Sequence, residues 1–408
     1  MWRHVFSRML TQLIVNGTLR ITYPDGSREE FGLAGQDEVH VTLHTSETLR
    51  ALCLRPELAL GEAYMDGRLT IENDDLDGLI RLVVRNQYAG QFPVWQRSIQ
   101  ALRVRARGWM MRNTPGRARQ NVAHHYDLSD DLYRLFLDDD MQYSCAYFTD
   151  PDMSLEDAQV TKKAHIAAKL RLEPGLRVLD IGCGWGGMAL TLARDYGVHV
   201  TGVTLSQNQL ATARTRARQA GMEDCTDFRL CDYRQLTDRF DRIVSVGMLE
   251  HVGLPHYPEY FEQVARLLAP DGVALVHTIG RCAPPMAPAQ WIGKYIFPGG
   301  YVPSLSELAG PIEQAGLWHM DLEVWRVHYA TTLRHWRDRF YANVETIRKT
   351  YDARFIRMWR YYLTVCILAF EEQHQAVFHF QMAHRRDAVP LTRDYLYRDP
   401  DSARRAAE

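Results

Sequence analysis

A glycine-rich loop, in the segment VLDIGCGWGG at residues 178–187, is the clearest candidate for chemistry in this sequence. Gly182, Gly184 and Gly186 follow an apolar run typical of a buried strand, and Asp180 stands near the end of that run. Glycines here let a ligand approach the backbone closely, at the carboxyl end of a parallel sheet where open α/β folds bind ligands. The loop predicts a cofactor site, although a tight turn without a ligand has the same pattern.

The next strand and helix help to distinguish the cofactor. The glycines follow a GxGxG spacing, and the second strand ends in Thr204 instead of the acid that would bind the ribose of NAD. Thr204, Ser206 and Gln209 could supply ribose hydrogen bonds, and Asp232 with Tyr233 follows the third strand, where an adenine contact is expected. Ser206 could equally serve only to cap the helix that follows it.

Two further ionisable residues stand at strand ends. Glu250 follows the fourth strand and His277 ends the fifth, and from position alone Glu250 could cap the next segment and His277 could be a hydrogen-bonded core histidine. His374, His379 and His384 recur at every fifth position, which suits neither a helix face nor a metal site, and we assign them no function. The seven cysteines form no CxxC pair, so no metal site and no disulfide framework are expected.

The elements that must position these residues alternate from residue 154 onward. Strands predicted at 177–181 and 198–205 are nearly all apolar, with helices between the strands, which indicates a parallel sheet covered on both faces. Residues 18–43 predict short strands with a turn at 24–26, and 46–87 predict helices. The tail at 330–385 is predicted to be helical.

Composition sets limits on the partners. The formal charge is −2, so no overall field favours nucleic acid. Residues 79–126 nevertheless contain nine arginines and no acid, which predicts either a local anion-binding surface or a solvated helix face. No run of 18 apolar residues occurs and the first residues lack a signal-peptide pattern, so we expect any membrane contact to be peripheral. The seven cysteines, without a disulfide framework, fit a cytoplasmic location.

Several motifs together resemble the cyclopropane fatty acid synthase family, which includes the mycolic acid cyclopropane synthases. They cover about 120–385 in the family's order, and LGEAYMDG (60–67) resembles its non-catalytic N-terminal domain. The motifs are AHHYDLSDDLYRLFLD, MQYSCAYF, VLDIGCGWGG, VTLSQNQ, SVGMLEHVG, HTIG, IFPGGYVPS, HYATTL and YYLTVC.

The resemblance implies a Rossmann-like class I methyltransferase fold, with a mainly parallel seven-stranded sheet and a small α+β N-terminal domain. It implies an S-adenosyl-L-methionine site and a bicarbonate ion that serves as the base. The expected cofactor residues are Tyr143, Ser144, Asp180, Gly182, Gly184, Gly186, Thr204, Ser206, Gln209, Asp232 and Tyr233. The positions that match the bicarbonate ligands are Cys145, Glu250, His277, Ile279 (through its N–H) and Tyr329, and Cys366 matches a position proposed as catalytic.

The activity implied is methylene transfer from S-adenosyl-L-methionine to the cis double bond of an unsaturated phospholipid, which gives a cyclopropane fatty acid. A sibling activity giving a methyl-branched or exomethylene chain, an inactive lipid-binding protein and a small-molecule N-methyltransferase remain alternatives. We expect a homodimer at the inner face of the cell membrane. The expected domains are 1–90, an Arg-rich linker helix at 91–119 and a methyltransferase domain at 120–395, with a lipid-binding insert at 281–304.

Overall fold

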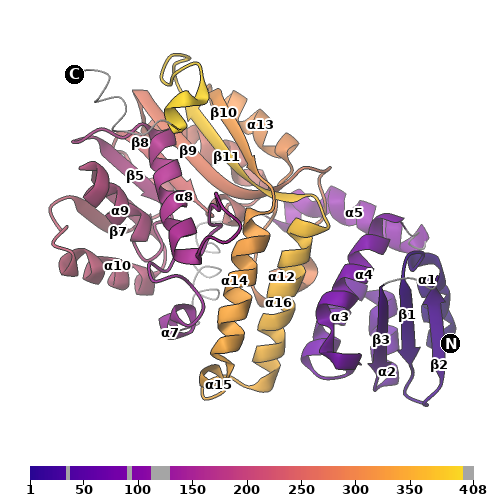
Figure 1. Ribbon diagram of the computed structural model, residues 1–408. Helices are drawn as coiled ribbons and strands as arrows, with labels where there is room; N and C mark the ends of the chain where they lie inside the picture. The colour runs from indigo at the N-terminus through magenta and orange to yellow at the C-terminus, as the bar shows by residue number, and fades with distance from the viewer. Residues whose placement is uncertain (34–36, 90–93, 112–128, 398–408) are drawn as a thin grey trace. The chain divides into compact units, whose positions relative to one another are not determined.

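The computed structural model describes residues 1–33, 37–89, 94–111 and 129–397 (Figure 1). Contacts divide the chain into two units, which are described separately. The first unit comprises Met1–Met110, Pro285–Pro298 and Tyr329–Gln375, and the second unit comprises Met111–Pro284, Gly299–His328 and Ala376–Glu408. In this division, most of the helical tail and part of the predicted insert group with the N-terminal segment, and the expected domain boundaries stay a prediction.

The first unit contains a four-stranded sheet in the order β2-β1-β3-β4. Its first three strands and the turn at Gly26 confirm the prediction for residues 18–43, and Asp25 accepts a hydrogen bond from the backbone N–H of Ser27 at 3.0 Å within that turn. The short fourth strand falls inside a region predicted to be helical. The strands are β1 (Thr18–Thr22), β2 (Arg28–Gly32), β3 (Glu38–Leu43) and β4 (Leu69–Ile71).

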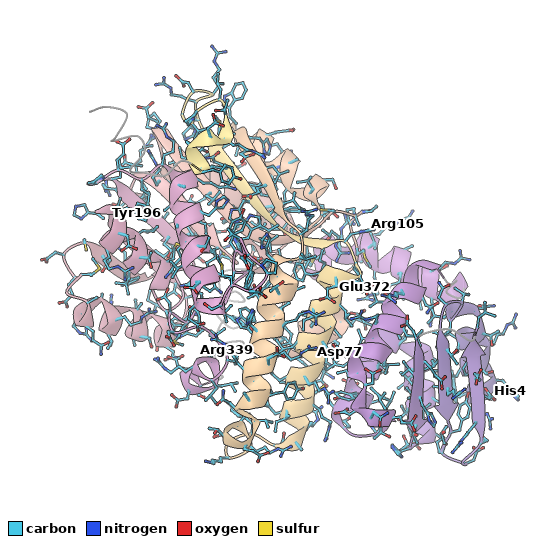
Figure 2. The ribbon with its side chains drawn as sticks, viewed as in Figure 1. His4, Asp77, Arg105, Tyr196, Arg339 and Glu372 are labelled. Atoms are coloured by element: carbon cyan, nitrogen blue, oxygen red, sulfur yellow. The ribbon has the colours of Figure 1, made fainter. Side chains whose placement is uncertain are left out.

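Helices make up the rest of the first unit. Helix α16 packs against α3 and α4, and α12 packs against α3. Ion pairs connect further positions: Arg85 of α4 contacts Glu372 at the end of α16 at 2.9 Å, and Arg337 of α14 contacts Asp77 of α4 at 2.7 Å. Figure 2 labels Asp77 and Glu372. The helices are α1 (Trp2–Leu13), α2 (Ser46–Leu54), α3 (Pro56–Met65), α4 (Leu76–Ala89), α5 (Val94–Met110), α12 (Gln290–Tyr295), α14 (His328–Ala342), α15 (Val344–Ile347) and α16 (Ala353–Glu371).

The second unit is built on a seven-stranded sheet in the order β10-β11-β9-β8-β5-β6-β7. The pairs β9–β8, β8–β5, β5–β6 and β6–β7 are parallel, and β10 pairs antiparallel with β11. This confirms the predicted fold. The strands are β5 (Arg177–Ile181), β6 (His199–Thr204), β7 (Thr226–Leu230), β8 (Phe240–Val246), β9 (Leu268–Arg281), β10 (Trp318–Trp325) and β11 (Gln375–Ala383).

Helices cover both faces of this sheet. Alternate strand residues enter two cores, so that Ile243 packs with residues of α11 and α13 while Val244 packs with residues of α8, α9 and α10. Among the described residues, no helix is long and apolar enough to cross a membrane. The helices are α7 (Asp130–Arg134), α8 (Leu155–Leu170), α9 (Gly187–Tyr196), α10 (Gln207–Gln219), α11 (Tyr257–Leu267) and α13 (Leu305–Gln314). Short 3-10 turns are Glu72–Asp74, Tyr233–Gln235, Leu249–His251, Leu254–His256 and Arg393–Leu396.

The end of the predicted helical tail is wrong, because residues 375–383 form strand β11. Phe378, Phe380 and Met382 enter one core, and His379 with Gln381 alternates with them along the strand. A strand has a side-chain period of two, so this alternation places His379 on the face opposite Phe378. The recurrence of histidines at every fifth position therefore does not reflect a helix in this region.

Candidate active site

The glycine loop connects β5 to α9 in a backbone conformation that requires glycine. Gly182, Gly184 and Gly186 have φ values of +83°, +53° and +85°, which are unfavourable for other residues. A Cβ added at Gly186 would lie 3.0 Å from Ala213, whereas one added at Gly184 would meet no described atom within 4 Å. The loop thus packs tightly on one side and leaves backbone approachable on the other, which fits a bound nucleoside.

Asp180 lies at the floor of this loop and is 2% exposed. Its Oδ2 atom has no hydrogen-bond partner among the described residues. Burial raises the pKa of Asp180 to about 7, although the charge of Lys162 opposes the rise. A carboxyl group in this state needs a polar partner, as an S-adenosyl-L-methionine site would provide.

A buried lysine joins the loop region to the segment that contains Tyr143. Lys162 of α8 donates to Oε1 of Gln142 at 2.8 Å and to Oγ of Ser144 at 2.9 Å. Burial lowers its pKa to about 8. The predicted cofactor residues Tyr143 and Ser144 therefore lie beside a positive charge that the sequence analysis missed, because a lysine on an amphipathic helix is normally solvated.

Helix α7 is tied to the loop by a second contact that sequence reasoning missed. Asp130 accepts hydrogen bonds from Nε1 of Trp185 at 3.0 Å, from Asn208 at 2.7 Å and from Thr212 at 3.0 Å. Tyr133 packs against both Trp185 and Tyr143, with ring centroids 5.1 and 5.2 Å apart. These contacts link α7, the loop and α10 around the candidate cofactor site.

The residues predicted to bind the ribose contact one another. Thr204 donates to Oε1 of Gln209 at 2.9 Å, and Oγ of Ser206 accepts from the backbone N–H of Gln209 at 3.3 Å. Ser206 thus caps α10, as the structural alternative predicted. Asp232 pairs with Arg234 at 2.6 Å, and Tyr233 packs edge-on against Tyr260. Their cofactor role stays a prediction.

Glu250 lies in a buried turn after β8, at the carboxyl edge of the sheet. Its Oε1 accepts from the Ile279 N–H at 2.6 Å, while Oε2 has no partner among the described residues. Burial raises the pKa of Glu250 to about 7, and the Ile279 hydrogen bond limits the rise. The Ile279 N–H thus donates to Glu250, and its expected role as a bicarbonate donor stays a prediction.

His277 precedes this pair on β9 and is 2% exposed. Its Nδ1 lies 2.7 Å from Nε2 of His379, so the histidine to which the sequence analysis gave no function contacts a predicted site residue. Cys145 is fully buried, with Sγ 3.3 Å from the carbonyl oxygen of Ala146. Glu250 thus has a carboxyl oxygen that is unpaired among the described residues, and burial lowers the pKa of His277 well below its usual range, so that its imidazole is neutral. The role of these residues and of Cys145 as bicarbonate ligands stays a prediction.

Tyr329 and Cys366, the remaining predicted site residues, belong to the first unit. Tyr329 packs against Trp336 and Phe370, with ring centroids 5.7 and 5.0 Å apart. Burial raises the pKa of the Cys366 thiol to about 12, so the thiolate is scarce at neutral pH. This argues against Cys366 as a nucleophile.

The predicted insert contributes α12 to the first unit. Trp291 is 2% exposed and lies against Gly61 of α3, where an added Cβ would come within 2.3 Å of Nε1. Lys294 and Tyr295 both contact Glu62, at 2.5 and 2.8 Å. The packing of Trp291 therefore agrees with the alternative hypothesis, that residues 281–304 form an ordinary core-packing loop. A role of this insert as a lid stays a prediction.

The arginine-rich block divides into paired and exposed residues. Arg81 and Arg85 form ion pairs with Glu372, and Arg103 donates to the carbonyl oxygen of Pro288 at 2.8 Å. Arg97 and Arg105 are exposed on α5, where Figure 2 labels Arg105. Exposed Ile99 and Leu102 lie on the same helix. The predicted anion-binding surface is thus smaller than expected, and Arg112, Arg117 and Arg119 lie outside the described residues.

Comparison with known proteins identifies relatives over most of the chain. A family model described as mycolic acid cyclopropane synthetase matches residues 113–380, and a domain of unknown function matches residues 5–90. The cyclopropane-fatty-acyl-phospholipid synthase of Escherichia coli is 41% identical over 349 residues, which are 84% of this chain and 87% of the relative. The tuberculostearic acid methyltransferase UfaA1 of Mycobacterium tuberculosis is 32% identical, and the match covers 93% of this chain and 90% of the relative.

Solved structures agree with this assignment. The structure of mycolic acid cyclopropane synthase CmaA1 in complex with SAH and CTAB has a TM-score of 0.61 and 35% identity, covering 65% of this chain and 97% of that one. The predicted family, fold and enzyme class are therefore confirmed. The chain belongs to the mycolic acid cyclopropane synthetase family and is an S-adenosyl-L-methionine-dependent methyltransferase.

Proposed function

We propose that the protein transfers a methylene group from S-adenosyl-L-methionine to the cis double bond of an unsaturated phospholipid acyl chain, and so forms a cyclopropane fatty acid. The observation that carries this proposal is the buried Glu250 carboxyl group, held at Oε1 by the Ile279 N–H and open at Oε2. An alkene is a weak nucleophile, and ring closure after methyl transfer must remove a proton in a dry site.

The side chains have complementary roles in this reaction. When bound, S-adenosyl-L-methionine would supply an electrophilic methyl group and bicarbonate a base. Glu250, with a pKa of about 7, can hold a proton at Oε2 and share it with a neighbouring anion. We propose that His277 and Cys145 are further ligands of the bicarbonate within the second unit, and the role of Tyr329 rests on the family resemblance alone.

Lipid analysis tests the product. The chain is expressed in cells whose phospholipids contain monounsaturated acyl chains, and the extracted lipids are examined by mass spectrometry and proton NMR. Upfield ring protons are expected. Vinylic protons would instead establish an exomethylene product, and a methyl branch without ring protons would establish a methyl-branched product. The second outcome is included because one relative is named tuberculostearic acid methyltransferase. Unchanged lipids, with cofactor bound to the protein, would contradict each of these activities.

We also propose peripheral contact with an anionic membrane through the exposed residues of α5. Arg97 and Arg105 are exposed there with Ile99 and Leu102, which are 49% and 67% exposed. A basic residue near an anionic surface contributes about 1 kcal/mol. Replacing both arginines by Gln should weaken binding to vesicles of anionic phospholipid by about 30-fold in co-sedimentation, on that basis.

A matched control is available on another exposed arginine. Arg218 lies on α10 in the second unit and is exposed. Arg218→Gln should leave vesicle binding unchanged, and equal losses for both variants would contradict the proposed face. We propose a homodimer and a location at the inner face of the cell membrane, to be tested by light scattering and by cell fractionation.

A further inference from the structure

A row of buried polar side chains lies behind His277 in the second unit. His277 of β9 and His379 of β11 are 2% and 0% exposed, and Nδ1 of the first lies 2.7 Å from Nε2 of the second. Lys169 of α8 is also fully buried, and its Nζ lies 3.4 Å from Nδ1 of His379. The row thus runs from a site residue to a lysine on the covering helix.

The lysine end of the row is an ion pair. Lys169 and His165, four residues apart on α8, both contact Oε2 of Glu323 on β10, with His165 at 2.8 Å. Burial opposes ionisation of Glu323, but the hydrogen bond from His165 and the charge of Lys169 lower its pKa to about 2. The carboxylate is therefore ionised at neutral pH and keeps a positive partner beside it.

The chemistry of these groups gives the row a direction. An ammonium group has hydrogen-bond donors and no acceptor, so Nδ1 of His379 must accept from Lys169. Burial lowers the pKa of both histidines well below the usual range, so each ring is neutral and has one N–H. The N–H of His379 is then on Nε2 and donates to Nδ1 of His277.

We propose that the Lys169–Glu323 ion pair, acting through His379, fixes His277 in the tautomer that has its proton on Nε2. Lys169, His379 and Glu323 are then positioning residues. His277 would present a neutral N–H donor to an anionic ligand beside Glu250. This inference rests on the proposed function only for the identity of that ligand, since the tautomer itself is a property of the protein alone.

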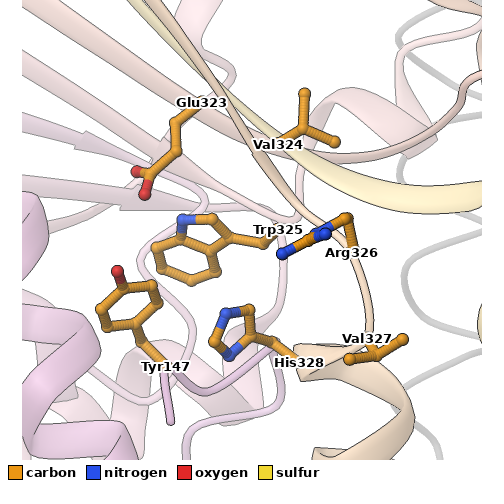
Figure 3. A pocket seen from close by; sticks show the side chains of 7 residues that line it. All are labelled: Tyr147, Glu323, Val324, Trp325, Arg326, Val327 and His328. Carbon is orange, nitrogen blue, oxygen red and sulfur yellow. The ribbon is translucent and has the colours of Figure 1, made fainter. Parts of the chain in front are cut away.

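Trp325 holds the two rings in place. Its ring lies 3.9 Å from that of His379 and edge-on to that of His277 at 5.4 Å, measured between centroids. Figure 3 shows Trp325 between Glu323 and the rings of Tyr147 and His328, in a pocket that these residues line. Trp325 on one side and α8 on the other restrict rotation of the His277 and His379 rings. Fixed ring orientations are needed if the hydrogen bonds are to keep a single donor-to-acceptor direction.

The test is a direct measurement of the tautomer. Protein labelled with ¹⁵N in its histidines is examined without substrate by long-range ¹H–¹⁵N correlation NMR, and the His277 signals are assigned by their loss in His277→Gln. The expected pattern is a protonated Nε2 and an unprotonated Nδ1. A proton on Nδ1 in the unaltered protein overturns the proposal, whatever the variants do.

Two substitutions reverse or remove the direction. Lys169→Met removes the donor, so His277 should populate both tautomers. Glu323→Gln should leave Lys169 partly uncharged, because burial lowers the pKa of Lys169 and Glu323 is the main group that opposes this, ahead of Asp321. The His277 tautomer should become mixed there also. An unchanged tautomer in both folded variants would overturn the proposal.

One rescue and one control complete the design. In His379→Gln, the amide oxygen can accept from Lys169 and the amide nitrogen can donate to His277, so the Nε2 tautomer should persist. His384→Gln removes the histidine that follows β11, whose Nε2 contacts the Ala265 carbonyl oxygen, and should leave the His277 tautomer unchanged. The affinity for bicarbonate, measured by titration, should fall about tenfold in Lys169→Met. An Nε2 tautomer without cyclopropane product would contradict only the proposed function, whereas product with an Nδ1 tautomer would contradict only this inference.

Discussion

The two ends of the candidate site are built in different ways. The cofactor end consists of backbone, namely three glycines of one loop with positive φ between β5 and α9. The acid–base end consists of buried side chains from β9, β11, α8 and the turn at Glu250. Its contacting side chains lie far apart in the sequence, and Lys169 and His379 are 210 positions apart. A site made of backbone is encoded locally, whereas a site made of side chains depends on how distant strands pair.

The largest effect should come from breaking the acid–base end. Glu250→Gln keeps the shape of the side chain but removes the exchangeable carboxyl proton, so kcat should fall by about 100- to 10,000-fold. Affinity for S-adenosyl-L-methionine, measured by calorimetry, should change by less than about twofold, because the glycine loop is untouched. Loss of cofactor affinity along with kcat would mean that the two ends are not independent.

The same residue should make stability depend on pH. The pKa of Glu250 is about 7 in the folded protein, against an ordinary value of 4.5. Between these pH values the folded chain holds a proton that the unfolded chain has lost, so the free energy of unfolding falls as pH rises. This loss is complete above pH 7 and amounts to roughly 3 kcal/mol. Glu250→Gln should therefore gain stability relative to the unaltered protein between pH 5 and pH 8 in urea unfolding.

A smaller effect should follow from altering the cofactor end. Gly186→Ala places a side chain at φ +85° and 3.0 Å from Ala213, which should weaken S-adenosyl-L-methionine binding by about tenfold through displacement of the loop. Gly221→Ala is the matched control, because Gly221 also has a positive φ, of +65°, but no described atom lies within 4 Å of an added Cβ. Equal losses of affinity would show that backbone strain alone, and not the loop, is responsible.

The same contrast explains which features the sequence could predict. Gly182, Gly184 and Gly186 mark the loop because glycine alone tolerates their conformation, and the apolar strands mark the sheet. His379 was assigned no function because its neighbours were interpreted as helical. The alternation of Phe378, His379 and Phe380 is the local signal of a strand that could have corrected this.

Other contacts leave no local signal. Lys162 and Lys169 have the helical spacing of solvent-facing residues, yet both are fully buried because α8 covers the sheet with that face. Trp291 lies in a proline- and glycine-rich segment typical of a mobile loop, and its burial depends on Gly61, 230 positions earlier, leaving room for the ring. Such pairings require the three-dimensional fold.

Strand β11 lies between β10 and β9 in the sheet, although it follows both in the chain. During synthesis on the ribosome, the sheet must therefore accept this strand as an internal insertion after its neighbours have been made. His379 reaches its place beside His277 only at that moment. A chain that ends before β11 therefore contains every residue of the glycine loop but lacks His379, and it cannot form the contact between His379 and His277.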